Sequence, residues 1–456
     1  MAPEAVILDP YRPYASMLIQ RLYDRHGIRT VCLHSTWRER LLLEGRLPVL
    51  RSKAVSAHYM VAGLDWRTVA QRLARHHSIV GVLPYEEGMV RPLTIIAEEL
   101  GLSWSQPHVQ YAFRDKFALK QLVSRNDPRI RLNAFARVRT VDDVQEVVRT
   151  HDLQRYVLKP NSGSGNQNVA FFDHDAPVRD VSDYLAQVDS DVLLEEYVTG
   201  PEFWVNGQMD AEGVPTVVGI GRYYRIQDND VENLEVGSYS VQPHEPVFGP
   251  LRDYAESVMR ATGLRRSPFH LEAIVDDSGP CLVEVAARLC GELGTLLDMR
   301  HHGPQLDLID IAAHYYVSDR PLGPVPLDWE RVGRSWVATV TGVSPHDQRL
   351  VKVEGVTEVE QSRSFLFWIK RPAPGDFVHR TQSLTTRAWS VTVRGDLQTD
   401  PRDAIDGVRS TIRLHGTGDG ELDLREKWPM YRGVAAKMWA SRPRPYEGKA
   451  LLRPLR

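Results

Sequence analysis

The first hundred residues alternate short apolar runs with amphipathic stretches, and no other feature of the sequence constrains the fold as strongly. Residues 5–9 and 29–34 have the apolar character of short strands, and residues 14–25 between them have helical periodicity. Residues 79–84, followed by a helical run that ends at Gly101, repeat the pattern. Strands that alternate with helices favour a parallel sheet covered by helices. This part is therefore predicted to be α/β, and no GxGxxG dinucleotide fingerprint follows the first strand.

From about residue 114 onward the pattern changes to two amphipathic helices followed by strands in hairpin order. The helices are expected at residues 115–123 and 141–150, and Thr140 with Asp143 gives a capping-box pattern before the second. Polar or glycine-containing loops separate the expected strands, which cover residues 156–160, 170–173, 193–198, 202–210, 214–222, 270–275 and 281–288. Beyond residue 320 we expect strands at 365–370 and 388–394, a helix at 401–414, and a surface tail over about the last forty residues.

Length and charge exclude several classes of protein. A chain of 456 residues exceeds one ordinary hydrophobic core, so we expect about two to four subdomains. The formal net charge of -3 provides no general field for a phosphate backbone, so nucleic acid is not expected as a partner. No apolar run reaches the roughly 18 residues of a membrane span, and the cysteines, Cys32, Cys281 and Cys290, lack the spacing of a metal site. We expect a cytoplasmic protein without a membrane partner.

The first candidate for chemistry is a strand that runs into a loop of small residues. Residues 158–165 read Leu-Lys-Pro-Asn-Ser-Gly-Ser-Gly. Gly163, Ser164 and Gly165 would let backbone N–H groups approach a phosphate, and Lys159 would add a positive charge. A plain hairpin turn after an edge strand explains the same residues equally well. The loop is not a Walker A motif, because no Gly-Lys-Ser/Thr ends it.

The second candidate is the acidic end of a later strand, where Glu195, Glu196, Tyr197 and Val198 precede Glu202. Backbone groups at such a strand end can bracket an adenine edge, and an acid one turn later can accept hydrogen bonds from ribose hydroxyls. Taken alone, charged pairs near strand ends are more often solvated surface.

The third candidate is a hairpin that carries His270, Glu272, Glu284 and Arg288. Because alternate residues of a strand share a face, His270 lies with Glu272, and Glu284 lies with Arg288. The neighbouring positions are apolar, so the opposite face should pack in a core and both carboxylates should face one cavity. Mg²⁺ held by one or two carboxylates and by ATP phosphates is the natural cation for such a pair. A structural ion pair between Arg288 and a glutamate is the alternative.

These motifs, in this order, resemble the ATP-grasp superfamily, specifically its carboxylate–amine ligase branch with the bacilysin-type and dapdiamide-type L-amino acid ligases. The resemblance covers about residues 114–294. It implies that Lys116, which follows Asp115 at a helix start, and Lys159 reach the nucleotide phosphates, under a lid loop at 163–165. It further implies the following roles: adenine binding by residues 195–198, ribose binding by Glu202, metal binding by Glu272 and Glu284, and stabilisation of the reacting carboxyl or acyl phosphate by Arg288.

The same resemblance implies an ATP-grasp fold with α/β and α+β elements. Its expected parts are an N-terminal parallel α/β domain over residues 1–112, a lid subdomain over 113–200, an antiparallel metal and substrate subdomain over 201–318, and a C-terminal β-rich cap with a tail over 319–456.

The activity that this resemblance implies is ATP-dependent ligation of small-molecule carboxylate and amine substrates through an acyl phosphate. The expected metal is Mg²⁺, with Mn²⁺ as an alternative, and dimers are common among such relatives, so a homodimer is an open expectation. His270 is a candidate for proton transfer or substrate contact, beside the alternative of a structural histidine. Two other functions stay open: a ligase whose acceptor is a carrier protein or another nucleophile, and an ATP-binding module without turnover. The second is motivated by Ala286, which cannot ligate a metal and stands where many members have asparagine.

Overall fold

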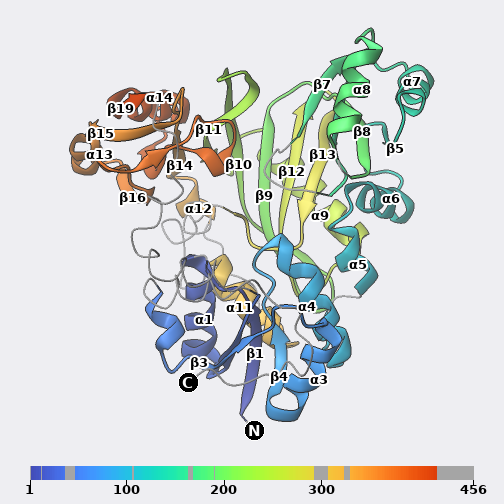
Figure 1. The fold of residues 1–456 in the computed structure, drawn as a ribbon, viewed down its shortest axis with the longest axis vertical. Helices are drawn as coiled ribbons and strands as arrows, with labels where there is room; N and C mark the ends of the chain where they lie inside the picture. Colours follow the sequence, from blue (N-terminus) through green and yellow to red (C-terminus); the bar gives the residue numbers. More distant parts are fainter. Residues whose placement is uncertain are drawn as a thin grey trace, which may run out of the picture.

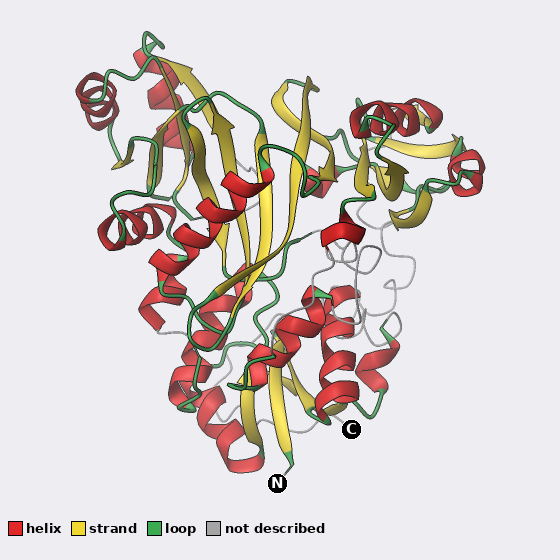
Figure 2. Ribbon diagram, turned by 180° about the vertical axis from the view of Figure 1, so that it is seen from behind, coloured by secondary structure: helices red, strands yellow, loops and turns green. Residues whose placement is uncertain are grey.

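A computed structural model describes residues 2–11, 13–35, 47–104, 107–162, 168–188, 190–291, 307–322 and 329–418. Within these residues the strands form four sheets. The N-terminal unit occupies one end of the molecule, and the lid sheet and the C-terminal unit flank the opposite end of the large central sheet (Figures 1 and 2). None of the described helices is both long and apolar enough to cross a bilayer.

The N-terminal unit is a four-stranded parallel sheet in the order β3-β2-β1-β4. Its elements are β1 (Pro3–Leu8), α1 (Pro13–His26), β2 (Arg29–His34), β3 (Val55–Met60), α3 (Trp66–His76), β4 (Ser78–Val82) and α4 (Glu87–Glu99). Strands β1 and β2 are buried over nearly their whole length, as their continuous apolar runs require in a parallel sheet covered by helices. The predicted alternation of strands and helices is confirmed.

The lid sheet is antiparallel and contains four strands in the order β5-β8-β6-β7. Its elements are β5 (Phe135–Val138), α7 (Val141–Thr150), β6 (Arg155–Pro160), β7 (Ala170–Asp173), α8 (Val178–Gln187) and β8 (Val192–Glu196). The predicted capping box opens α7, because Thr140 and Asp143 each accept a hydrogen bond from the backbone N–H of the other. Both helices pack on apolar side chains of the strands and form a small separate core.

The central sheet is antiparallel and has eight strands in the order β13-β12-β9-β10-β11-β14-β18-β16. Its first half consists of β9 (Glu202–Met209), β10 (Pro215–Asp228), β11 (Val231–Ser240), β12 (Pro268–Asp276) and β13 (Gly279–Ala286). Helices α5 (Pro107–Ala112), α6 (Lys116–Asn126) and α9 (Phe248–Thr262) share a core with one face of these strands, to which Phe203, Val205 and Leu271 contribute. Alternation then directs Glu202 and Glu272 to the other face.

The C-terminal unit continues the central sheet through β14 (Ser335–Gly342), β18 (Trp389–Asp396) and β16 (Phe365–Lys370). A three-stranded sheet of β17 (Phe377–Val378), β15 (Gln348–Glu354) and β19 (Arg413–Gly418) accompanies it, with helices α12 (Trp329–Val332), α13 (Val356–Gln361) and α14 (Pro401–Thr411). The predicted helix over 401–414 is wrong at its end: α14 stops at Thr411, and the next residues pair with β15 instead. The predicted tail lies outside the described residues.

Helix α11 (Leu308–Val317) brings the chain back to the N-terminal unit, where its apolar residues join the core of the parallel sheet. A Cβ at Gly81 of β4 would lie 2.2 Å from the Tyr316 carbonyl oxygen, so the strand and the helix are in close backbone contact. Arg25 of α1 also pairs with Asp310 at 2.7 Å. The four domain boundaries proposed from the sequence stay a prediction.

Candidate active site

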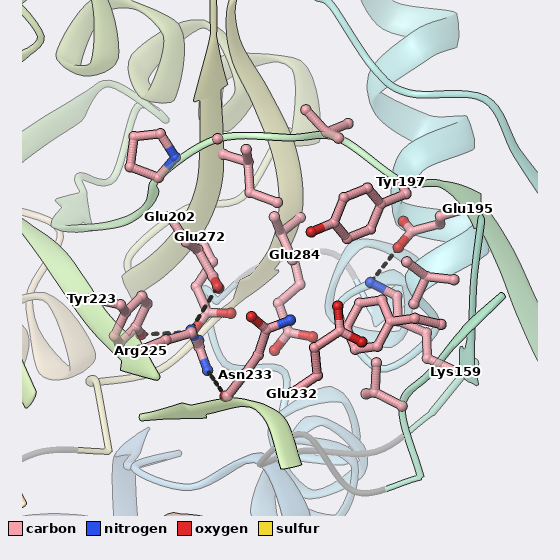
Figure 3. Close-up of a pocket in the computed structure, with 18 of the residues that line it drawn as sticks. Lys159, Glu195, Tyr197, Glu202, Tyr223, Arg225, Glu232, Asn233, Glu272 and Glu284 are labelled. Atoms are coloured by element: carbon pink, nitrogen blue, oxygen red, sulfur yellow. Dashed lines mark hydrogen bonds and ion pairs between the residues drawn. The ribbon is translucent and has the colours of Figure 1, made fainter. Parts of the chain in front are cut away.

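A cavity of about 750 Å³ lies between the lid sheet and the first half of the central sheet (Figure 3). Its walls come from β6, β7 and β8 on one side and from β9 to β13 on the other. Nine of the predicted site residues line it: Lys116, Lys159, Glu195, Glu196, Tyr197, Val198, Glu202, Glu272 and Glu284. Gly163, Ser164 and Gly165 lie outside the described residues.

On the lid side, a buried carboxylate lies between two lysines. Lys159 Nζ on β6 is 2.5 Å from one oxygen of Glu195 on β8, and Lys120 of α6 contacts the other oxygen. The Lys120 ammonium also donates to the side-chain oxygen of Asn133 at 2.6 Å and to the carbonyl of Leu282 at 2.9 Å. We call Lys120, Lys159 and Glu195 the lid-side charge group. It fixes the Lys159 ammonium at the cavity wall.

The pKa values of this group follow from burial and charge together. Burial alone would raise the pKa of Glu195, but the two lysines outweigh it and lower that pKa below its usual range. Burial likewise opposes the charge on Lys159, yet Glu195 and Glu284 hold its pKa above the ordinary value. Both groups are therefore charged at neutral pH. For Lys120 burial is the stronger effect, and its pKa is lowered.

An apolar wall lies beside the lid-side charge group. It includes Val157, Phe171 and Tyr197. The Tyr197 and Phe171 rings meet edge to face, with 5.7 Å between their centroids, and the Arg155 guanidinium lies 4.4 Å from the Tyr197 centroid. The side chain of Glu196 accepts a hydrogen bond from the Ala134 N–H at 3.1 Å. Rigid aromatic surface next to polar backbone suits the binding of a flat base.

On the opposite wall, Glu272 of β12 and Glu284 of β13 are direct cross-strand partners. The Tyr223 hydroxyl donates to Glu272 Oε1 at 2.7 Å, and His270 Nε2 lies 3.4 Å from the same oxygen. Lys116 Nζ lies 3.2 Å from Glu284 Oε2. Among the described residues, no group donates a hydrogen bond to the second oxygen of either carboxylate. Each glutamate therefore keeps one oxygen for the cavity.

Glu202 adds a third carboxylate to the cavity, and its partner is Arg225 at 2.9 Å. Burial raises the pKa of Glu202, and the nearby charges of Glu272 and Glu284 raise it further against the opposing effect of Arg225. Burial alone would also raise the pKa of Glu272, but hydrogen bonds from His270 and Tyr223 lower it to about 2. The cavity thus holds repelling carboxylates that a bound cation would stabilise.

The donor set fits Mg²⁺ bound together with phosphate oxygens. In the described ranges, no three or more His, Cys, Asp or Glu side chains form a complete metal site. Mg²⁺ does not need one, because it usually keeps several waters and binds one or two carboxylates plus substrate phosphates. The free oxygens of Glu272 and Glu284 provide such a pair. Ala286 is buried on β13 and adds no ligand.

Neither of the two predicted catalytic residues lines the cavity. His270 bonds to the side-chain oxygen of Asn206 through Nδ1 at 2.7 Å, and its Nε2 points toward Glu272 and the Tyr223 hydroxyl. The His270 ring therefore lies beside Glu272, a candidate metal ligand, and is close to its Oε1 atom.

Arg288 follows β13 and reaches the N-terminal unit. Its Nη2 donates to Glu87 at the start of α4 at 2.7 Å, and Glu87 also pairs with Arg114. Burial would raise the pKa of Glu87, but Arg288 and Arg114 lower it. The structural ion pair considered for Arg288 is thus present, with Glu87 as the partner.

Four residues that the sequence does not single out contact predicted site residues: Lys120, Tyr223, Arg225 and Glu87. Lys120 lies one helical turn after Lys116, which is a detectable spacing, but a buried lysine carries no local signal. Tyr223 and Arg225 reach the acidic wall from β10, across β9, and only the sheet order brings them there.

Comparisons with known proteins agree with this geometry. The model of the ATP-grasp domain family matches residues 155–296. Dapdiamide A synthase of Enterobacter agglomerans is 24% identical over 278 residues, which cover 57% of this chain and 62% of that relative, less than two thirds of its length.

Solved structures extend the likeness to most of the chain. The L-amino acid ligase from Bacillus licheniformis superposes with a TM-score of 0.71 at 16% identity, covering 91% of this chain and 99% of that one. Phosphoribosylglycinamide synthetase from Anaerococcus prevotii gives 0.64 at 12% identity, covering 91% and 100%. The predicted resemblance to the ATP-grasp superfamily, and to dapdiamide-type ligases within it, is confirmed. Residues 155–296 match the ATP-grasp domain model, and the chain has the ATP-grasp fold.

Proposed function

We propose that this protein is an ATP-dependent carboxylate–amine ligase that joins amino acid-like substrates and releases ADP and phosphate. The observation that carries the proposal is the convergence of Lys116, Lys159, Glu272 and Glu284 on one cavity from four separate elements. The Lys159 ammonium on the lid side, and Glu272, Glu284 and Lys116 on the opposite wall, border a space large enough for a nucleotide and a small substrate. The similarity to dapdiamide A synthase supports this reaction class.

In the first step, a substrate carboxylate oxygen attacks the γ-phosphorus of ATP, ADP leaves, and an acyl phosphate forms. Lys116 and Lys159 neutralise the phosphoryl oxygens, so catalysis depends on positioning and electrostatics. Mg²⁺ at Glu272 and Glu284 supplies further charge neutralisation when it is bound, and Mn²⁺ is an alternative ion.

In the second step, the amine nitrogen attacks the acyl carbon, phosphate leaves, and the nitrogen loses a proton. Arg288 follows Glu284 by four residues in the chain and pairs with Glu87 at 2.7 Å; burial opposes its charge, but Glu87 raises the pKa of the guanidinium, with a smaller contribution from Glu284. A cation held there can stabilise the oxyanion of the tetrahedral intermediate. The acceptor is proposed to be a small-molecule amine, and the assembly a cytoplasmic homodimer with the four domains predicted from the sequence.

A panel assay tests the proposal directly. The purified chain is incubated with ATP, Mg²⁺ and amino acids in pairs, and phosphate release and product mass are recorded. Phosphate release that needs both an acid and an amine, with a product of the summed mass minus water, supports the ligase. ATP turnover that requires a thiol or a carrier protein favours the second function, whose acceptor is another nucleophile. Nucleotide binding without ADP under any acceptor contradicts the ligase and leaves a binding module, the alternative that Ala286 motivates.

A further inference from the structure

A chain of polar contacts leads to one carboxylate oxygen of Glu272, the Oε1 atom. Asn206 of β9 bonds to His270 Nδ1 at 2.7 Å, and His270 Nε2 lies 3.4 Å from Glu272 Oε1 and 3.3 Å from the Tyr223 hydroxyl. Tyr223 donates to the same Oε1 at 2.7 Å. The side chains of His270 and Glu272 are 13% and 17% exposed, so water competes little for these contacts.

The Tyr223 ring is itself held in place. The Arg225 guanidinium lies 4.7 Å from the ring centroid, and Arg225 pairs with Glu202 at 2.9 Å. Figure 3 shows Glu202, Tyr223, Arg225 and Glu272 gathered on one wall of the cavity. These residues come from three neighbouring strands, β10, β9 and β12, so their spacing is fixed by backbone hydrogen bonds of the sheet.

Tyr223 and His270 both contact Oε1 of Glu272 and not Oε2. The two oxygens of this carboxylate therefore have different surroundings. In the part of the chain that the structure describes, Glu272 Oε2 accepts no hydrogen bond, and the residue lines the cavity. A carboxylate on a flexible stem loses rotational freedom when it binds a metal, and hydrogen bonds to its other oxygen remove that freedom in advance. His270 acts in the same direction, because its bond to Asn206 fixes the orientation of the ring.

We propose that Tyr223 and His270, with Asn206 behind them, are positioning residues that orient the Glu272 carboxylate toward the bound metal ion. This inference rests on the proposed function only in taking Glu272 as a metal ligand. It assigns His270 an orienting role in place of proton transfer, and it gives Tyr223 a role in metal affinity. Removing a hydrogen-bond partner of a metal ligand commonly weakens metal affinity by about 10–100-fold.

The experiment measures metal binding rather than turnover. Full-length protein is saturated with a non-hydrolysable ATP analogue and titrated with Mn²⁺, and free Mn²⁺ is followed by electron paramagnetic resonance. Tyr223→Phe removes one hydroxyl, and we expect it to raise the Mn²⁺ Kd about 10-fold. Asn206→Leu does not touch Glu272 but releases the His270 ring, so we expect a smaller increase.

Tyr224→Phe is the matched control. Its hydroxyl donates to Asp406 of α14 at 2.9 Å, away from Glu272, so the Mn²⁺ Kd should equal that of the wild type. An unchanged Kd in both Tyr223→Phe and Asn206→Leu overturns the proposal, as does an equal rise in Tyr224→Phe. Should Tyr223→Phe fail to fold, Asn206→Leu decides alone.

The same titration separates this inference from the ligase reaction. Wild-type protein that binds Mn²⁺ with the analogue, loses affinity in Tyr223→Phe, yet forms no product in the panel assay supports the positioning role and contradicts the ligase. Product formation by wild-type protein together with unaltered Mn²⁺ affinity in the variants contradicts the positioning role and keeps the ligase. If the wild-type protein binds no Mn²⁺ in the presence of the analogue, the positioning role is overturned.

Discussion

The two walls of the cavity handle charge in opposite ways. In the lid-side charge group, the side chains of Lys120, Lys159 and Glu195 are 1%, 8% and 5% exposed, and both oxygens of the carboxylate have a lysine partner. On the acidic wall, Glu272 and Glu284 are 17% and 26% exposed, and the protein occupies one oxygen of each. The carboxylate of the first wall is neutralised by lysines without a ligand. The carboxylates of the second wall are only partly neutralised by the protein.

Lys120 and Glu195 thus serve the fold, whereas Glu272 and Glu284 are available for binding. A buried pair costs stability when one partner is removed, because the other charge stays buried and uncompensated. A carboxylate with a free oxygen facing a cavity has little to lose in stability and much to gain from a cation. We therefore expect substitutions of Lys120 or Glu195 to affect mainly folding, and substitutions of Glu272 or Glu284 to affect mainly metal-dependent activity.

Lys120→Met should be the most destabilising of the substitutions on the lid side. This substitution removes one of the two lysine partners of the buried Glu195 carboxylate. We expect the free energy of unfolding to fall by about 3–5 kcal/mol. Denaturant unfolding of the full chain measures it. The double variant Lys120→Met with Glu195→Leu removes the stranded charge as well and should recover part of the loss. Equal stability of Lys120→Met and wild type would contradict a structural role for the lid-side charge group.

Glu284→Gln tests the other wall. The amide keeps the shape but loses the charge opposite Glu272, and we expect metal-dependent ligation to fall by about 100-fold with little change in unfolding. Initial rates at several Mg²⁺ concentrations provide the measurement, and Glu358→Gln on the exposed face of α13 is the control. A stability loss as large as that of Lys120→Met would erase the contrast between the walls.

Acid stability offers a third, smaller effect. The folded-state pKa of Glu195 is lowered, so its stabilising contribution is complete above the unfolded value of about 4.3 and is lost as the pH falls through the lower folded pKa. The double variant lacks this carboxylate. Between about pH 5 and 3, its free energy of unfolding should therefore fall less steeply than that of the wild type. Parallel curves would show that Glu195 is not held ionised by the lysines.

The smallest expected effect concerns a contact that joins the walls. Arg155 of β6 pairs with Glu232 of β11 at 2.6 Å, but the two side chains are 36% and 40% exposed. Pairs of this kind contribute about 0–1 kcal/mol, so Arg155→Gln should weaken ATP-analogue binding by a few-fold at most. Calorimetric titration at low and high salt checks it. A loss that persists at high salt would point instead to the stacking of Arg155 on Tyr197.

The sequence contains the local parts of this site and lacks the long-range ones. Period-2 alternation predicts that Glu272 and Glu284 lie on the same face of two neighbouring strands. The structure pairs them directly across these strands, because a short hairpin fixes its own register. Tyr223 is not assigned in this way, since the strand predicted from the sequence ends at residue 222, whereas β10 continues to Asp228. The missed signal is the Asn229-Asp230 pair, whose backbone has positive φ angles of 52° and 61°. Asparagine and aspartate favour this conformation in tight hairpin turns.

The end of the C-terminal helix shows the opposite error. Helical periodicity predicts a helix through residue 414, although Thr411 and Ile412 are β-branched and favour strand geometry. The competing partner, β15, lies about sixty residues earlier and is invisible in a local window. Lys120 and Glu87 were missed for the same reason, because their partners Glu195 and Arg288 are distant in sequence.

The return of α11 to the parallel sheet matters for how the protein is made. Translation releases β1 to α4 first, but the helix that completes their core emerges about 200 residues later, roughly 10–40 s at ordinary ribosomal speed. During that interval the nascent chain exposes the apolar surface that α11 will cover. The N-terminal unit is thus synthesised before the central sheet, but its core is complete only after α11 has emerged.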